Sequence, residues 1–185
     1  MNRLFIALNI PEEIKDNIIE IRNSVQQSKN FKWEPKEKLH LTLKFIGEVD
    51  RSILNLIIDE LNFIENYSVI NCSIYKFNFF FRNKKPSILW AGLKTDETLL
   101  QLVDELNYRL KKLSIPIEEK KFKSHLTLLR LKNDPGINFV NSFKKFTFEP
   151  IVFTANSVSV IKSELNPSGS KYFELKNYKL KQLEK

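Results

Sequence analysis

The sequence is poor in several features, and each shortage excludes a class of protein. Cys72 is the single cysteine among 185 residues, so an intrachain disulfide and a thiolate metal cluster are both excluded. Four glycines and seven prolines are too few for a collagen-like or low-complexity chain. No apolar stretch approaches the ~20 residues of a membrane span, and residues 4–10 run into Pro11 without a signal-peptide cleavage site. We expect a soluble cytoplasmic protein with no membrane partner, in which Cys72 is a buried apolar side chain.

The chain has enough apolar residues to form a packed core. Apolar residues make up 42% of the sequence, with fifteen phenylalanines among them, and we expect one domain over residues 1–185. Lys and Arg number 30 against 22 Asp and Glu, which gives a net charge of +8. Such a charge attracts polyanions, nucleic acid first among them. A general bias toward Lys, Asn and Ile would give the same charge, so charge alone does not decide the partner.

Hydrophobic periodicity predicts an alternation of helices and strands. The expected strands cover residues 3–10, 39–46, 69–81, 87–94, 124–132, 151–162 and 171–180. The expected helices begin at Pro11, Asp50, Asp96 and about residue 136. The second of these has an apolar face formed by Ile53, Leu56, Ile57, Leu61 and Ile64, and the third has one formed by Leu99, Leu102, Val103, Leu106, Leu110 and Leu113.

Several strand pairs are joined too tightly for a crossover connection, which favours antiparallel sheets with helices on one face. The chain also repeats the order strand, helix, strand with a histidine, once in each half. We therefore predict an α+β fold of two lobes packed as one unit, at approximately residues 1–95 and 96–185, with possible strand exchange between them.

The strongest signal is a repeated tetrapeptide. The chain has only two histidines, and each begins the sequence His-Leu-Thr-Leu, at His40 and at His125. From average residue usage the chance of this repetition is on the order of one in a million or less.

In a strand, residues i and i+2 share a face. His40 and Thr42 then point to one side while the leucines and Phe45 point to the core, and the same holds for His125 and Thr127. Each Thr is expected to lie along this face and not toward the ring, which argues against a serine-protease arrangement. If a pseudo-twofold relates the halves, both wet faces line one cleft.

Such a cleft suits a phosphodiester. An unperturbed imidazole has a pKa near 6.5, so one ring can act as base while the other acts as acid, with a bell-shaped rate profile between about pH 5 and 8. Threonine hydroxyls can donate hydrogen bonds to phosphate oxygens, where charge builds up in the transition state. Two alternatives stay open: a histidine on a half-buried strand is often only a packing residue, and two histidines could be part of a metal site. A third ligand is missing from the motifs, which disfavours a metal.

The paired motifs resemble those of the two-histidine (2H) phosphoesterase superfamily, and in particular its RNA 2',3'-cyclic phosphodiesterase branch, historically called 2'-5' RNA ligases. The resemblance covers essentially the whole chain. Its supporting stretches are residues 3–8, 40–48, 89–92, 122–130 and 163–167, together with Tyr172.

The resemblance implies a bilobal duplicated fold, with two pseudo-symmetric lobes that face each other across an active-site groove. It implies hydrolysis of 2',3'-cyclic phosphate ends of RNA, or of small cyclic nucleotides, to 2'-phosphomonoesters by a monomer without metal or cofactor. His125 would accept a proton from water, His40 would protonate the departing 3' oxygen, and Thr42 and Thr127 would hold phosphate oxygens. Ligation of tRNA halves through a 2'-5' bond, and RNA or nucleotide binding without turnover, are the alternatives.

Other residues near the motifs are further candidates for the site. The family often has an arginine where Arg130 stands, but strict alternation puts Arg130 opposite His125 unless a bulge or the strand's end turns it inward. Lys44 is expected on the wet face, mainly as a solvated side chain. Three aromatic residues could stack on RNA bases, although core packing is the favoured interpretation for each: Phe5, Trp33 and Trp90.

Overall fold

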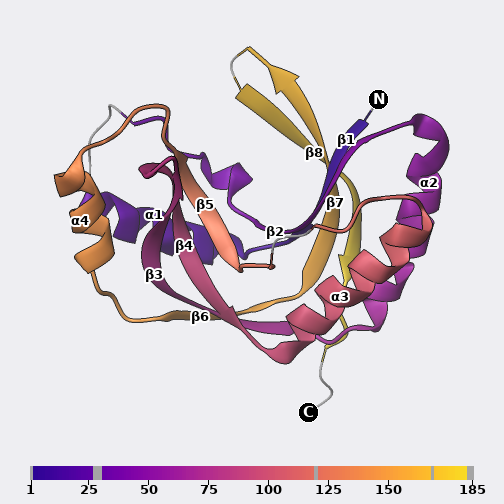
Figure 1. Ribbon diagram of the computed structural model, residues 1–185. Helices are drawn as coiled ribbons and strands as arrows, with labels where there is room; N and C mark the ends of the chain where they lie inside the picture. Colours follow the sequence, from indigo (N-terminus) through magenta and orange to yellow (C-terminus); the bar gives the residue numbers. More distant parts are fainter. Residues whose placement is uncertain (1, 27–30, 119–120, 168, 183–185) are drawn as a thin grey trace.

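The computed structural model describes residues 2–26, 31–118, 121–167 and 169–182, and Figure 1 shows their arrangement. The described residues form eight strands in one sheet, with the order β6-β3-β4-β5-β2-β1-β7-β8, and every neighbouring pair is antiparallel. The strands are β1 (Asn2–Leu8), β2 (Leu41–Val49), β3 (Ile70–Arg82), β4 (Lys85–Thr95), β5 (His125–Arg130), β6 (Ile151–Ala155), β7 (Ser157–Asn166) and β8 (Gly169–Lys179). The predicted α+β class and antiparallel pairing are confirmed.

The sheet consists of two half-sheets that meet at its centre. There β2 pairs with β5 at a single position, Leu41 opposite Leu126. On either side of this contact the order reads outward as β5-β4-β3-β6 and as β2-β1-β7-β8. β1 and β2 thus correspond by position to β4 and β5, which matches the predicted repetition of strand, helix and histidine-bearing strand.

The half-sheets do not follow the division of the chain at residue 95. Each takes two strands from the first half of the sequence and two from the second. The division into two lobes at approximately residues 1–95 and 96–185 therefore stays a proposal. In such a division each lobe would contribute two strands to the half-sheet of the other.

Four α-helices cover the outside of the curled sheet (Figure 1). They are α1 (Glu12–Val25), α2 (Arg51–Glu60), α3 (Glu97–Lys112) and α4 (Ile137–Lys145), and two 3-10 helices accompany them, η1 (Lys36–Lys38) and η2 (Leu61–Asn66). α1 follows β1 but contacts β6 of the other half-sheet, while α3 follows β4 and contacts β2. In each repeated unit the helix therefore packs against a strand of the other half-sheet. None of the described helices has the length and hydrophobicity needed to cross a membrane.

Two predicted elements are corrected by the structure. The strand expected over residues 151–162 is two strands, because the chain leaves one edge of the sheet at Asn156: β6 pairs with β3 and β7 pairs with β1. The helix expected to continue to Ile64 changes to a 3-10 helix at Leu61. Leu61 and Ile64 are buried as predicted, whereas Leu56, which lies within α2 itself, is 54% exposed and does not belong to the buried face.

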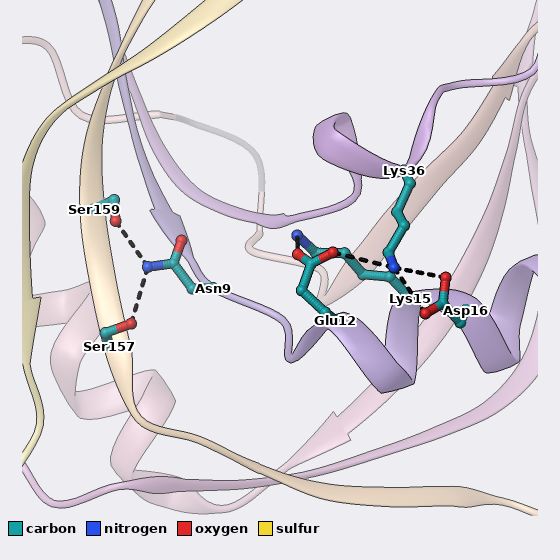
Figure 2. A network of polar contacts seen from close by, with 7 residues as sticks. All are labelled: Asn9, Glu12, Lys15, Asp16, Lys36, Ser157 and Ser159. Carbon is teal, nitrogen blue, oxygen red and sulfur yellow. Dashed lines mark hydrogen bonds and ion pairs between the residues drawn. The ribbon is translucent and has the colours of Figure 1, made fainter.

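Polar contacts hold the segment that leads to the first histidine motif (Figure 2). Asn9 donates hydrogen bonds to the buried Ser157 and Ser159 hydroxyls, at 2.9 and 2.7 Å, and so joins the end of β1 to β7. Lys36 of η1 forms an ion pair of 2.6 Å with Asp16 of α1. These contacts fix both ends of the chain segment that connects β1 to β2.

The lone cysteine lies in the core, as predicted. Cys72 is buried among the apolar side chains of β3. Burial raises the pKa of its thiol to about 12, so the thiol is uncharged at neutral pH and unsuited to act as a nucleophile.

Candidate active site

A cavity of about 760 Å³ lies where the half-sheets meet, and the residues of both tetrapeptides line it. His40 lies immediately before β2 and Thr42 lies at its start, and His125, Thr127 and Arg130 come from β5. Five residues predicted from sequence therefore share one cavity, although the two motifs are 85 positions apart (125 minus 40).

His40 is held by aromatic rings and by polar contacts. Its ring stacks on Phe5 of β1 with centroids 4.9 Å apart, and Tyr172 of β8 approaches it edge-on at 5.6 Å. His40 Nε2 shares a hydrogen bond of 3.1 Å with Thr42 Oγ1. The expectation that each threonine points away from its histidine ring is therefore wrong for this pair, because the chain enters β2 only after His40 and the ring can turn toward Thr42.

Burial lowers the pKa of His40 to about 4. A hydrogen bond with the Lys38 backbone opposes this shift, while the positive charges of Lys15, Arg130 and protonated His125 lower the pKa further. His40 is therefore neutral in the unliganded protein at pH 7.

His125 is oriented in a similar way. A backbone carbonyl can only accept a hydrogen bond, so the 2.7 Å contact between His125 Nδ1 and the Lys123 carbonyl oxygen assigns the proton to Nδ1. Nε2 of the neutral ring then carries a lone pair and can accept a proton. Phe80 packs edge-on against the ring at 4.9 Å, with Trp90 at 6.1 Å. Burial lowers the pKa of His125, and the charges of Arg130 and Lys123 add to the effect.

Sequence reasoning missed the groups that orient the imidazoles. Each ring bonds to the backbone two residues earlier, at Lys38 and at Lys123. A signal was present, because the repeat begins with these lysines and reads Lys-x-His-Leu-Thr-Leu in both halves. The edge-on contact of Phe80 had no such signal, since β3 is far from both motifs in the sequence.

Arg130 lies on the cavity side of β5. A register shift in the pairing of β4 with β5 buries both Leu128 and Leu129, so the residue after them returns to the side of His125. Its side chain is 59% exposed and forms an ion pair of 3.2 Å with Glu34. Strict alternation would have placed Arg130 on the face opposite His125. The structure instead has the arrangement in which a bulge turns Arg130 inward.

Lys44 and Phe45 are placed opposite to expectation. Lys44 is 2% exposed, its Nζ donates a 2.6 Å hydrogen bond to the Pro116 carbonyl, and burial lowers its pKa. Phe45, expected in the core, is 55% exposed and lines the cavity. The cause is a pair of register shifts between β1 and β2, which interrupt the alternation after Thr42.

The three aromatic residues considered for base stacking pack within the protein. Phe5 and Trp90 are buried beneath the two imidazoles, and Trp33 packs against the core with the Arg22 guanidinium 4.5 Å from its ring centroid. The favoured interpretation as packing residues is confirmed.

The described residues contain no group of three or more His, Cys, Asp or Glu side chains that could hold a metal ion. The polar groups that the cavity offers are the imidazoles, hydroxyls, two carboxylates and five cationic side chains: Arg3, Lys38, Lys121, Lys123 and Arg130. This set of side chains suits proton transfer and the binding of an anion.

One antiparallel sheet that brings a His-x-Thr motif from each half into a common cavity defines the two-histidine class of phosphoesterases. The chain belongs to the LigT-like phosphoesterase family, whose sequence profile matches residues 8–90 and 93–172.

Relatives and solved structures agree with this assignment. Two relatives, from Thermotoga maritima and Methanocaldococcus jannaschii, are each 29% identical and are each named RNA 2',3'-cyclic phosphodiesterase. The alignments cover 92% and 95% of this chain, and 91% and 99% of the relatives. A Thermus thermophilus crystal structure, 26% identical, superimposes with a TM-score of 0.78 over 96% of this chain and 97% of that one. The Escherichia coli LigT complex with 3'-AMP has the same fold, with a TM-score of 0.78 at 22% identity over 98% and 99% of the chains.

Proposed function

We propose that the protein hydrolyses 2',3'-cyclic phosphate ends of RNA to 2'-phosphomonoesters by two-histidine acid–base catalysis that needs no metal. The observation that carries the proposal is the convergence of two oriented imidazoles from separate half-sheets on one cavity. The names of the relatives support the substrate class, because each is called an RNA 2',3'-cyclic phosphodiesterase.

In the proposed reaction the His125 Nε2 lone pair accepts a proton from water as the water oxygen bonds to phosphorus. The bond between phosphorus and the 3' oxygen breaks on the opposite side, and protonated His40 donates a proton to that oxygen. Thr42, Thr127 and Arg130 donate hydrogen bonds to the non-bridging phosphate oxygens. The product is a 2'-phosphomonoester with a free 3' hydroxyl, and solvent exchange returns both rings to their starting states.

His40 must be protonated to act as the acid, although its pKa is about 4 without ligand. A bound phosphodiester carries a negative charge, and an opposite charge nearby raises the pKa of an imidazole. The substrate therefore helps to protonate the group that it needs. The charge of Arg130, which lowers the pKa of both imidazoles, is neutralised by the same anion.

The pKa values predict an acid optimum for kcat/KM. This parameter reports the free enzyme, so we expect its bell to lie between about pH 4, set by His40, and a value below 6.5, set by His125. The bell for kcat reports the bound state and should lie at higher pH, because the anion raises both values. Initial rates from pH 3.5 to 9 would test this. Superimposed bells centred near pH 7 would contradict the proposed role of burial.

Product analysis tests the function itself. With a chelator present, the protein is expected to convert an oligonucleotide 2',3'-cyclic phosphate to a strand of equal length ending in a 2'-phosphate. A 3',5'-cyclic nucleotide serves as the control and should stay intact, because its phosphorus is bonded to the 3' and 5' oxygens and not to the 2' oxygen. A longer strand in the presence of a 5'-hydroxyl RNA would instead show ligation. Activity that disappears with chelator and returns with a divalent cation would overturn the metal-free proposal.

We propose that one chain forms the complete site and that the protein works as a monomer in the cytoplasm. Both histidines, both threonines and Arg130 come from the same chain and line the same cavity, so a second copy is not needed to complete it.

A further inference from the structure

The repeat that carries the histidines begins with a lysine that has no role in the chemistry proposed above. Lys38 and Lys123 each stand two residues before a cavity histidine, and both side chains line the cavity. The contacts that orient the imidazoles use the backbone of these residues, so they do not require lysine side chains. The two ammonium groups therefore need a separate explanation.

Lys38 extends from the cavity to the β7–β8 hairpin. Its Nζ lies 5.5 Å from the Tyr172 ring centroid, and Tyr172 in turn contacts the His40 ring. A Cβ built on Gly169, at the start of β8, would come within 3.9 Å of the same Nζ. The hairpin protrudes from the sheet at the top of Figure 1. Lys38 thus places a positive charge between the reacting centre and the hairpin tip.

Lys123 has the matching place on the other side. Its Nζ lies 4.5 Å from the Trp90 ring centroid and 5.2 Å from that of Phe80, and both rings pack against His125. Within the described part of the chain, neither Lys38 nor Lys123 forms an ion pair. A cation held over an aromatic face keeps its outer N–H groups available for an anion.

The stereochemistry of the reaction distinguishes the two lysines. In an in-line displacement the attacking water and the departing 3' oxygen lie on opposite sides of phosphorus. The 3' oxygen belongs to the ribose, so the ribose and the RNA chain attached to its 5' side lie toward His40, while the water lies toward His125. Lys38 is therefore on the side of the RNA chain, and Lys123 is on the side of the nucleophile.

We propose that Lys38 binds the phosphodiester on the 5' side of the terminal nucleotide and so makes the site selective for RNA ends over free cyclic mononucleotides. This inference rests on the proposed function. A lysine ammonium acts as a point charge on a phosphate and reads no base edge, so the selectivity is for chain length and not for sequence.

The test compares an oligonucleotide 2',3'-cyclic phosphate with a 2',3'-cyclic mononucleotide. We expect Lys38→Met to lower kcat/KM for the oligonucleotide about fivefold more than for the mononucleotide, and Lys38→Arg to restore most of the difference. The salt dependence should change as well: the slope of log kcat/KM against log salt for the oligonucleotide should become shallower by about 0.7 in Lys38→Met. Lys123→Met is the matched variant and should change the substrate ratio less than twofold. Lys145→Met, at an exposed position outside the cavity, controls for net charge.

Three results would overturn the proposal: equal losses on both substrates, an unchanged salt slope, or a larger change of ratio in Lys123→Met. A binding measurement distinguishes a failure of the Lys38 proposal from a failure of the proposed function, because binding needs no turnover. The affinity for a labelled oligonucleotide ending in a 2'-phosphate should fall about fivefold in Lys38→Met, while that for 2'-AMP falls less. A protein inactive on every cyclic phosphate would refute the function, and these affinities would still decide the role of Lys38.

Discussion

Replacing either cavity histidine by alanine should lower kcat by about 10²- to 10⁴-fold, as the loss of a general acid or base does. His40→Ala removes the ring that stacks on Phe5 and shares a hydrogen bond with Thr42, and His125→Ala removes the ring held by the Lys123 carbonyl. Because the two groups act in one step, the double variant should lose much less than the product of the single losses. Initial rates at the pH optimum of each variant give the comparison.

Folding must be checked beside activity, since both rings pack on buried aromatic residues. Thermal unfolding of the glutamine variants, His40→Gln and His125→Gln, provides the control, because glutamine keeps a polar group of similar reach. A folded His125→Gln or His40→Gln protein that turns over at a near-wild-type rate would refute the assigned roles.

The same variants can distinguish the acid from the base. A cyclic substrate with sulfur in place of the 3' oxygen releases a thiolate, and a thiol with a pKa near 8.5 departs without help from an acid. His40→Ala should therefore recover at least about tenfold of its lost rate on the sulfur substrate, while His125→Ala should not recover. The reverse pattern would assign the base to His40, an order that the low pKa of this residue in the free protein would also permit.

The residues of the candidate active site could be predicted from sequence because the prediction depends on repetition, which does not require knowledge of backbone detail. The two His-Leu-Thr-Leu segments stand out in a chain with only two histidines. The long amphipathic elements were equally accessible: the face predicted for α3 is buried at Leu99, Leu102 and Leu106. A hydrophobic periodicity that continues over four helical turns identifies the buried face even where single positions depart from the pattern.

Strand register could not be predicted in the same way. Alternation holds from Leu41 to Leu43 and then fails at Lys44, and it also fails before Arg130, in each case where the partner strand shifts register. The position of a bulge depends on which residue of one strand pairs with which residue of the neighbouring strand. That pairing forms between segments far apart in the chain. The burial of Lys44 and the inward placement of Arg130 are consequences of strand pairing, so no local sequence pattern predicts them.

The electrostatics of the site also arise from distant segments. His40 is desolvated by Phe5 at the beginning of the chain and Tyr172 near its end, and His125 by Phe80. Sequence alone therefore gave each imidazole its ordinary pKa near 6.5 and an optimum between about pH 5 and 8. Burial in the folded protein lowers both pKa values and moves the expected optimum of kcat/KM toward acid.

The Thr127 hydroxyl is expected to contribute the next largest share of the rate after the histidines. Among the described residues Thr127 Oγ1 has no hydrogen-bond partner, whereas Thr42 Oγ1 is already shared with His40 Nε2 at 3.1 Å. Thr127 can therefore donate directly to a non-bridging phosphate oxygen, where negative charge increases as water attacks. Removal of one such donor costs about 10²- to 10³-fold in kcat, or about 2.7–4 kcal/mol of transition-state stabilisation.

Thr127→Val tests this role, because valine keeps the shape and β-propensity of threonine but lacks the hydroxyl. The loss should appear in kcat with a small change in KM, since the hydrogen bond strengthens as charge develops. Thr127→Ser retains the donor and should stay within about tenfold of the wild-type rate. Thr42→Val should also slow turnover, but it should shift the acid limb of the kcat/KM profile as well, because it removes the partner of His40. A near-wild-type rate in Thr127→Val together with a large loss in Thr127→Ser would mean that packing of the methyl group, and not the hydroxyl, is what the site requires.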